Sequence, residues 1–308
     1  MANFPIASGH PDLSNLKYIP QLYASRLLVA FYAATCLASI ANTDYEGQVK
    51  DQGDKVIIRT LPQIDIKTYT KGQPLEYQNA EPSNVELLLD KGKYWAFNVD
   101  DVDYKQSDIA YIDDWAKDGA TRLKIAIETG VFSDIYDDVS SSNAGATAGA
   151  ESSGFNLGTT SSPVSLTKAN IIDYIVDCGT VLDEQNVPED GRWLLLPPKY
   201  CGLLKKSDLK DASLTGDSTS VLRRPDGRLG MIDRFTIYKN NNLYEVSADS
   251  ATHCLFGHKV GLTFASQMTK QDTVKSEQTF GSRVRALQVY GYKVVKSEAL
   301  GTLYAAAG

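Results

Sequence analysis

The stretch from Ser107 to Val139 carries apolar or small side chains every three or four residues. These side chains belong to Ile109, Ile112, Ala116, Ala120, Leu123, Ile127, Val131 and Ile135. The spacing places them on one face of an α-helix. At about 1.5 Å per residue the helix would be about 50 Å long, which exceeds the width of a small domain. The pattern therefore predicts one long helix along which other parts of the chain must pack.

Runs of β-branched and aromatic residues precede this helix and alternate with residues typical of turns. Strands are predicted at 53–59, at 63–70 and within 85–99, with a turn at 90–93. The stretch 71–83 contains two prolines and one glycine and is expected to be exposed. We interpret residues 45–104 as antiparallel hairpins that form a long, thin projection. Two strands alone are marginally stable in water, so this projection needs support from elsewhere.

The N-terminal region has no strand pattern. Residues 1 to about 17 are polar and contain two prolines and one glycine, which indicates an extended arm without a core of its own. From Tyr18 to Ile40 apolar residues return at helical spacing, so one amphipathic helix is predicted after Pro20. We expect the helix to pack on an apolar surface and the arm to need a partner.

The second half of the chain reads as a separate mixed region. Residues 140–163 are almost entirely Ser, Ala, Gly and Thr, which predicts a flexible junction or surface loop. A helix is predicted from a capping Thr167 to about Leu182, and the fully apolar Trp193–Leu196 predicts a buried central strand. Further strands are predicted within 228–241 and 253–265, after a polar loop at 208–227.

The run from Val284 to Val295 has apolar residues at both odd and even positions, as expected for a strand covered on both faces. Arg283 and Arg285 share one face at its start. They could contact a phosphate or carboxylate ligand, but two such arginines more often pair with neighbouring acids. We therefore favour ion pairs.

Charge and cysteine usage exclude some classes of protein. The 308 residues carry 31 basic and 38 acidic side chains, a net charge of −7, which argues against tight sequence-independent wrapping of DNA. Four widely spaced cysteines without a Cys-x-x-Cys pair predict free thiols: Cys36, Cys178, Cys201 and Cys254. No signal peptide pattern is present, and no apolar run approaches the roughly 20 residues of a membrane span.

Candidate chemistry is sparse. The phosphate-binding glycine motifs and the nucleophile elbow are missing. His253, Cys254 and His258 could offer metal ligands, but no second ligand pair accompanies them, and His10 stands apart.

Acidic residues recur in pairs. Asp100, Asp101 and Asp103 could hold a divalent cation, but carboxylates before a helix are also favoured by capping and by the helix dipole. The other pairs are Asp113–Asp114 and Asp137–Asp138. We therefore predict no catalytic, cofactor-binding or metal-binding residues.

The order of these parts resembles a known family. With the segments "VPEDGRWLLLPP" at 187–198 and "RVRALQVYGYKVVKSEAL" at 283–300, the chain resembles the major capsid proteins of tailed bacteriophages, in particular podovirus-type and related ones. The likeness covers nearly the whole chain. It implies an α+β fold of the Hong Kong 97 type.

The resemblance also implies a division of the chain. It gives an N-terminal arm and helix at 1–44, an extended loop at 45–104, a peripheral domain at 105–164 and 266–308 with a spine helix, and an axial domain at 165–265. The arginines of the closing strand would lie where neighbouring subunits meet. The arm and the loop would gain stability by lying over adjacent subunits.

The function implied is a structural one. The chain would assemble as pentamers and hexamers into an icosahedral head that encloses double-stranded DNA without sequence-specific contacts, as part of the virion, after assembly in the host cytoplasm. Expected partners are other copies of the chain, a scaffolding protein, a portal protein and a decoration protein, with no cofactor and no membrane. Two alternatives remain open: an encapsulin-like compartment with an apolar peptide groove near the N-terminal helix, and a hydrolase that uses Asp100 to Asp103.

Overall fold

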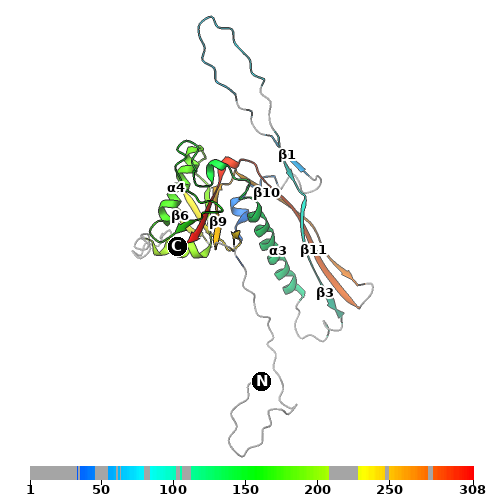
Figure 1. Ribbon diagram of the computed structural model, residues 1–308. Helices are drawn as coiled ribbons and strands as arrows, with labels where there is room; N and C mark the ends of the chain where they lie inside the picture. Colours follow the sequence, from blue (N-terminus) through cyan, green and yellow to red (C-terminus); the bar gives the residue numbers. More distant parts are fainter. Residues whose placement is uncertain are drawn as a thin grey trace, which may run out of the picture.

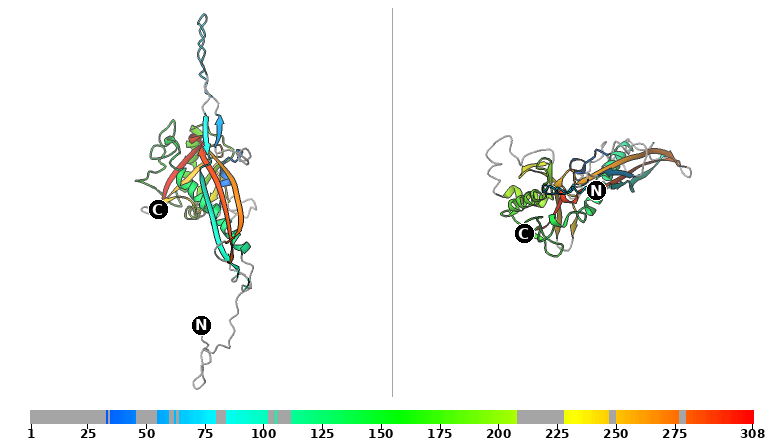
Figure 2. Two further views of the ribbon diagram at one scale, coloured as in Figure 1. Left: turned by 90° about the vertical axis from the view of Figure 1, so that its right-hand side faces the viewer. Right: turned by 90° about the horizontal axis from the view of Figure 1, so that it is seen from above.

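The computed structural model describes residues 33, 35–45, 55–59, 62, 64–79, 84–101, 105, 112–207, 228–246, 250–276 and 280–308. Within these residues the chain forms two main sheets with helices packed against them, so the α+β class is confirmed. The two sheets lie side by side rather than stacked face to face (Figures 1 and 2). We call them the long sheet and the broad sheet.

The long sheet consists of β3 (Lys91–Asp100), β10 (Leu262–Lys275) and β11 (Gly281–Val294), in the antiparallel order β10-β11-β3. One face is covered by α3 (Ile112–Asp134), which runs along it (Figure 1). The contact is close, because a Cβ added to Gly119 would lie 3.0 Å from the ring of Trp95. The strand predicted at 284–295 is therefore confirmed, and it is the central one of three. The expected coverage on both faces is wrong, since Arg285 and Leu287 are exposed.

The long helix is shorter than predicted. It has 23 residues, or about 35 Å at 1.5 Å per residue, and ends at Asp134 instead of Val139. Asp134, Asp137 and Asp138 lie at this end, where the helix dipole disfavours negative charge. The residues from 106 to 111, where the predicted helix begins, are outside the described residues.

The apolar stripe of α3 is buried in its second half only. Ile127, Val131 and Phe132 are at most 4% exposed, and the next turn adds the buried Ile135. Ala120, by contrast, is exposed. The helix therefore joins the core over its last two turns and covers only the long sheet before that.

The region 45–104 forms one hairpin base and one strand of the long sheet. β1 (Lys55–Arg59) pairs with β2 (Asn84–Leu88), and β3 pairs with β11. The predicted strand at 63–70 is wrong for its described part, since 64–70 makes no strand pairing; the turn predicted at 90–93 is also wrong, since β3 begins at Lys91. Side-chain contacts such as Asp65 N–H to Gln78 Oε1 at 2.9 Å link the two legs instead.

Residues 64–79, which we call the projecting loop, extend as a narrow excursion beyond β1 and β2 (Figure 1). All sixteen residues are exposed. The expected exposure of 71–83 is thus confirmed for 71–79.

The broad sheet has the order β4-β12-β9-β5-β7-β6, with β8 paired to β9. Its strands are β4 (Val164–Leu166), β5 (Arg192–Leu196), β6 (Arg228–Ile232), β7 (Phe235–Lys239), β8 (Glu245–Val246), β9 (Ala251–His258) and β12 (Leu300–Ala307). β5 is buried along its length between β9 and β7, as predicted.

The two faces of the broad sheet belong to two cores, which explains the unbroken apolar run in β5. Leu194 and Leu196 pack with α4 (Ile171–Glu184) and α5 (Pro198–Lys206). Trp193 and Leu195 pack with the end of α3, with α1 (Leu37–Ile40) and with Phe264 and Tyr290 of the long sheet. This second core joins the two sheets.

Three connections differ from the sequence prediction. The region 228–241 forms two strands, because Asp233 and Arg234 both adopt positive φ and close a tight hairpin. The region 253–265 also splits, with β9 in the broad sheet and β10 in the long sheet. After β11 the chain turns through η3 (Ser297–Ala299) and returns to the broad sheet as β12, so part of 266–308 lies outside the long sheet.

The stretch 140–163, for which a flexible junction or a surface loop was predicted, is a packed segment that exposes residues 150–154 at the surface. It contains η2 (Ser141–Asn143), and Ala148 and Leu157 are fully buried. The amide of Asn143 donates to the carbonyls of Glu298 and Leu300 at 2.7 and 2.8 Å. Small residues allow this close packing, which composition alone does not distinguish from flexibility.

The helix predictions are partly confirmed. α4 begins at Ile171, four residues after the predicted cap Thr167, whose hydroxyl donates to Asn170. Of the predicted helix from Tyr18 to Ile40, residues 18–32 and 34 lie outside the described residues, residues 33, 35 and 36 are not helical, and α1 covers its last four. All four cysteines are free and buried, as predicted.

Candidate functional site

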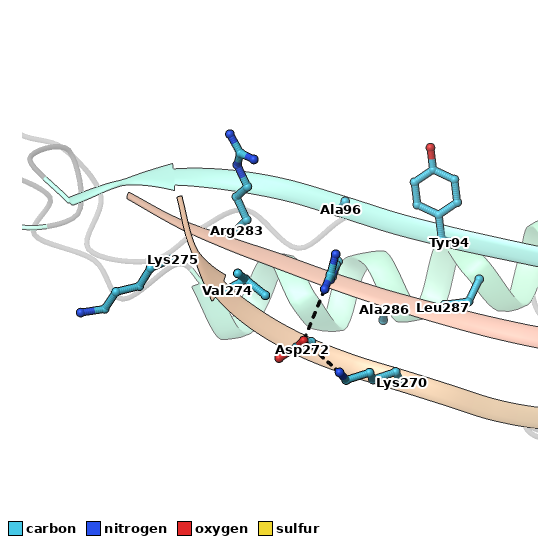
Figure 3. A pocket seen from close by; sticks show the side chains of 10 residues that line it. Tyr94, Ala96, Lys270, Asp272, Val274, Lys275, Arg283, Ala286 and Leu287 are labelled. Atoms are coloured by element: carbon cyan, nitrogen blue, oxygen red, sulfur yellow. Dashed lines mark hydrogen bonds and ion pairs between the residues drawn. The ribbon is translucent and has the colours of Figure 1, made fainter. Parts of the chain in front are cut away.

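A shallow groove of about 780 Å³ lies on the long sheet, on the face opposite α3 (Figure 3). Strand alternation positions its lining: Trp95 and Phe97 of β3 face α3, so Tyr94 and Ala96 face the other way. The other lining residues are Lys270, Asp272, Val274 and Lys275 of β10 and Arg283, Arg285, Ala286 and Leu287 of β11.

The two arginines singled out by the sequence both line this groove but differ in their partners. Arg285 lies 3.5 Å from Asp272, so the predicted ion pair is confirmed for it. Lys270 also contacts Asp272, at 3.3 Å. The hydrogen bond from Lys270, aided by Arg285, holds the pKa of the Asp272 carboxyl below its usual range.

Arg283 is exposed, and among the described residues no carboxylate lies within ion-pair distance of it. Figure 3 shows its side chain directed away from Asp272. The groove carries four cationic side chains and one carboxylate, a formal charge of +3 in a chain whose net charge is −7. The groove is therefore a cationic patch on an acidic protein.

The groove also exposes apolar surface. Tyr94 is 76% exposed, and Val274 and Leu287 are each 38% exposed. This combination of apolar and cationic groups is typical of a surface that contacts another macromolecule.

The projecting loop is a second exposed apolar surface. Its large apolar side chains are Ile64, Ile66, Tyr69, Leu75 and Tyr77, which are 63 to 100% exposed. One ion pair, Lys67 to Glu76 at 2.8 Å, joins its legs. Figure 1 shows the loop beyond one end of the long sheet, whereas the groove lies towards the other end.

The histidines and the nearby cysteine do not converge. The His253 ring stacks between Tyr136 and Tyr304, with ring centroids 4.2 and 4.4 Å away, and burial lowers its pKa to about 4. Cys254 belongs to the core on the opposite face of β9, and a ring nitrogen of His258 lies 2.8 Å from the Asp190 carbonyl. Within the described ranges, no group of three His, Cys, Asp or Glu side chains is arranged for a metal ion.

The acidic pairs lie at separate ends of elements. Asp100 is the last residue of β3, opposite Gly281, and Asp101 is exposed with its N–H donating to the Phe280 carbonyl at 3.2 Å. Asp103 lies outside the described residues. The pair Asp113–Asp114 occupies the first turn of α3, and Asp137–Asp138 follows its end.

A second pocket, of about 380 Å³, lies beside α1 and tests the alternative of an apolar peptide groove. Its apolar lining includes Leu37, Ile127 and Phe264. Lys124 and Glu128 line it as well, together with several Ser, Thr and Gln side chains. The lining is therefore mixed, unlike the apolar groove expected of a cargo-peptide site.

Sequence reasoning missed Glu128, which is 1% exposed in the middle of the shared core. Its position beside Ile127 in the apolar stripe of α3 was the available signal.

None of the described helices is long and apolar enough to cross a membrane.

Comparisons with known proteins agree with this architecture. The family described as phage capsid protein matches residues 85–305. A chain from Mycobacterium phage Che8 has a similar structure, with a TM-score of 0.75, 24% identity, and coverage of 93% of this chain and 97% of that one. No match was found among curated protein sequences.

Two further similar structures come from capsids. A chain from the capsid of the cyanophage P-SCSP1u has a TM-score of 0.68 and 14% identity, with 98% of this chain and 100% of that one covered. A chain from the mature capsid of bacteriophage PhiM1 has a TM-score of 0.65 and 16% identity, with coverage of 99% and 97%. At these identities the likeness concerns the fold.

Proposed function

The chain belongs to the phage capsid protein family and has the Hong Kong 97-like fold, and from this premise we propose how it forms a shell. Copies of the chain assemble as pentamers and hexamers into an icosahedral head that encloses double-stranded DNA. The observation that carries the proposal is the pair of exposed surfaces at opposite ends of the long sheet. A contact between two different surfaces of identical subunits is heterologous, and such contacts close into rings when the rotation permits.

In this proposal the long sheet with α3 is the peripheral domain, and the broad sheet with α4 and α5 is the axial domain. The projecting loop and the N-terminal arm lie over adjacent subunits. An exposed side chain such as Ile66 supports this role, because apolar area left in water by one subunit is buried when a neighbour covers it.

We propose that Arg283 acts at such a contact. It is exposed and has no ionic partner among the described residues, and Tyr94 and Leu287 add apolar area beside it. A carboxylate from a neighbouring subunit would pair with the guanidinium, which is suited to bidentate contacts. Arg285, already paired with Asp272, would contribute less.

The remaining parts of the proposal concern partners and location. The net charge of −7 lets the shell enclose DNA without binding it tightly to the wall. The expected further partners are a scaffolding, a portal and a decoration protein. Assembly takes place in the host cytoplasm, the product is part of the virion, and the chain has no enzymatic role.

Assembly of the purified chain tests the proposal. Closed particles should form with or without a co-expressed scaffolding protein, as seen by electron microscopy. Arg283→Glu should lower particle yield by about tenfold, because the loss of about 1.4 kcal/mol of contact free energy changes an association constant tenfold. The melting temperature of the isolated subunit should stay the same. The control is Lys168→Glu, the same charge reversal at an exposed site away from the groove. Monomers under every condition would refute the shell, and equal yields for both variants would refute the role of Arg283.

A further inference from the structure

The buried carboxylate of Glu128 binds two distant parts of the chain, one with each oxygen. Oε2 accepts hydrogen bonds from the backbone N–H groups of Cys36 and Leu37 at 2.7 and 2.9 Å. Oε1 accepts from the side-chain amides of Asn240 and Asn242 at 2.5 and 2.9 Å. We call these five residues the Glu128 cluster. Their sequence separations from Glu128 are 91 to 114 residues.

The four donors to Glu128 that the described part of the chain provides are all neutral. Within the described residues, no Lys, Arg or His lies within ion-pair distance of its carboxylate. A carboxylate removed from water without a counter-ion must be stabilised by hydrogen bonds, and those to a charged acceptor are the strong ones. Loss of the donors on either side therefore makes the buried position of the Glu128 carboxylate less stable.

The two sides of the cluster lead to different parts of the subunit. Cys36 lies immediately before α1 and Leu37 is its first residue, and both belong to the helix that the sequence predicts after the arm, from Tyr18 to Ile40. On the other side, the N–H of Asn242 donates to Asn240, and the N–H of Asn240 donates to the carbonyl of Leu196 at the end of β5. A continuous set of hydrogen bonds thus runs from the start of α1, through α3, to the centre of the broad sheet.

The pocket beside α1 offers the Glu128 side chain a second position. Both Glu128 and Lys124 line it, and the two residues are four apart on α3, a spacing at which helical side chains meet. When the asparagines withdraw, the carboxylate can turn outwards, where water and the Lys124 ammonium solvate it. In that position it no longer holds Cys36 and Leu37.

We propose that Glu128 is a positioning residue that couples the position of Cys36 and Leu37, at the start of α1, to the position of the broad sheet on α3. A tilt of the broad sheet away from α3 removes Asn240 and Asn242 from Oε1. The carboxylate then moves outwards and releases the start of α1. Conversely, displacement of Cys36 and Leu37 from Oε2 weakens the hold of α3 on the broad sheet. The inference goes beyond the shell function, because it concerns a property of the single subunit.

Amide-resolved hydrogen exchange on the full-length subunit tests this coupling. Asn242→Ala removes one of the two side-chain amides that donate to Oε1. Exchange at the Cys36 and Leu37 amides should nevertheless become about tenfold faster, because their acceptor is less firmly held. The control is Glu245→Gln, which removes an exposed pairing with Lys199 elsewhere in the broad sheet and should leave both amides at the wild-type rate.

A second variant keeps the test decisive if Asn242→Ala folds poorly. Lys124→Ala removes the outer partner from an exposed position, so it should slow exchange at the same two amides by a few-fold. Faster exchange in Asn242→Ala and slower exchange in Lys124→Ala support the coupling. Wild-type rates at Cys36 and Leu37 in either variant overturn it, as does an acceleration in Asn242→Ala that extends equally to α4, because that is general destabilisation.

Discussion

The broad sheet buries most of its apolar side chains, whereas the projecting loop leaves its own exposed to water. Around Leu194, apolar residues from both helices and strands exclude water on one face of the sheet, and a second core does so on the other. In the loop, Ile66 is fully exposed and Tyr77 is 88% exposed. One region completes its burial within a single chain, whereas the other has apolar surface that only another molecule can cover.

The same division appears within α3. Its last two turns lie in the core that joins the two sheets, and its first turns cover the long sheet on the face opposite the exposed groove. Stability of the isolated subunit should therefore be concentrated at the broad sheet and the end of α3. The distal part of the long sheet and the loop should matter chiefly for association.

The largest expected effect is in the broad sheet. Leu194→Ala should lower the free energy of unfolding of the isolated subunit by about 3 to 5 kcal/mol, because Leu194 is fully buried in a packed core. Urea denaturation measures it. Met231→Ala in β6, where the side chain is 61% exposed, is the control and should change stability by less than about 0.5 kcal/mol. Equal effects of the two substitutions would show that the stability of the isolated subunit does not depend on the core of the broad sheet.

Acid should weaken the same region through His253. Burial lowers its folded-state pKa to about 4, below the ordinary value of 6.5, so the unfolded chain binds the proton more tightly. The contribution of this group to stability is fully present above about pH 6.5 and is lost as the pH falls through about 4. The loss is on the order of 3 kcal/mol.

Denaturation of the isolated subunit at several pH values from about 4 to about 7, a range that spans the two pKa values, measures the effect. His253→Phe keeps a ring in the stack with Tyr136 and Tyr304 but cannot titrate. The variant should therefore show a smaller fall in stability with acid than the wild type. Identical pH profiles would contradict a buried neutral imidazole at this position.

The boundary within α3 can be located by two truncations. Ile127→Ala should cost about 2 kcal/mol, at the low end of the usual range because the residue borders the pocket beside α1. Leu123→Ala, one turn earlier and only partly buried, should cost less. Thermal unfolding of both variants shows which substitution destabilises the subunit more. A larger effect at Leu123 would move the boundary of the joint core towards the start of the helix.

The smallest effect on the isolated subunit is expected in the projecting loop. The double substitution Ile66→Ala and Tyr77→Ala should change the free energy of unfolding by less than about 0.5 kcal/mol, since both side chains are already in water. Particle yield should fall in the same variant. A matched pair of exposed polar truncations, Thr68→Ala and Gln73→Ala, controls for general changes in the loop. A destabilised isolated subunit would show that the loop has intramolecular support.

Local patterns in the sequence predicted elements well but could not give their partners. The short apolar run at β5 was predictable as a buried strand because both faces are covered. The pairing of β11 with β3 joins residues about 180 positions apart, and nothing local indicates it. The partners of Glu128 could not be predicted for the same reason, since its hydrogen-bond donors lie about 90 residues before it and about 110 residues after it.

The composition of residues 140–163 gave a wrong prediction of flexibility, and composition gave little information on the contact surfaces. The small residues at 140–163 resemble a linker, yet Asn143 and Leu157 are fully buried there. Small side chains permit either outcome, and the tertiary contacts decide. Arg283 and Arg285 were recognised together, but only the strand pairing shows that Asp272 stands opposite Arg285 and leaves Arg283 without a described ionic partner.

The return of β12 to the broad sheet also sets an order of events during translation. β4 is made early, but its strand partner is β12, which is made after both β10 and β11. Residues 262–294 thus reach the ribosome exit before the broad sheet can be completed. A nascent chain should therefore hold an open sheet edge at β9 until residues 300–307 emerge, so the broad sheet is completed only after the strands of the long sheet have been synthesised.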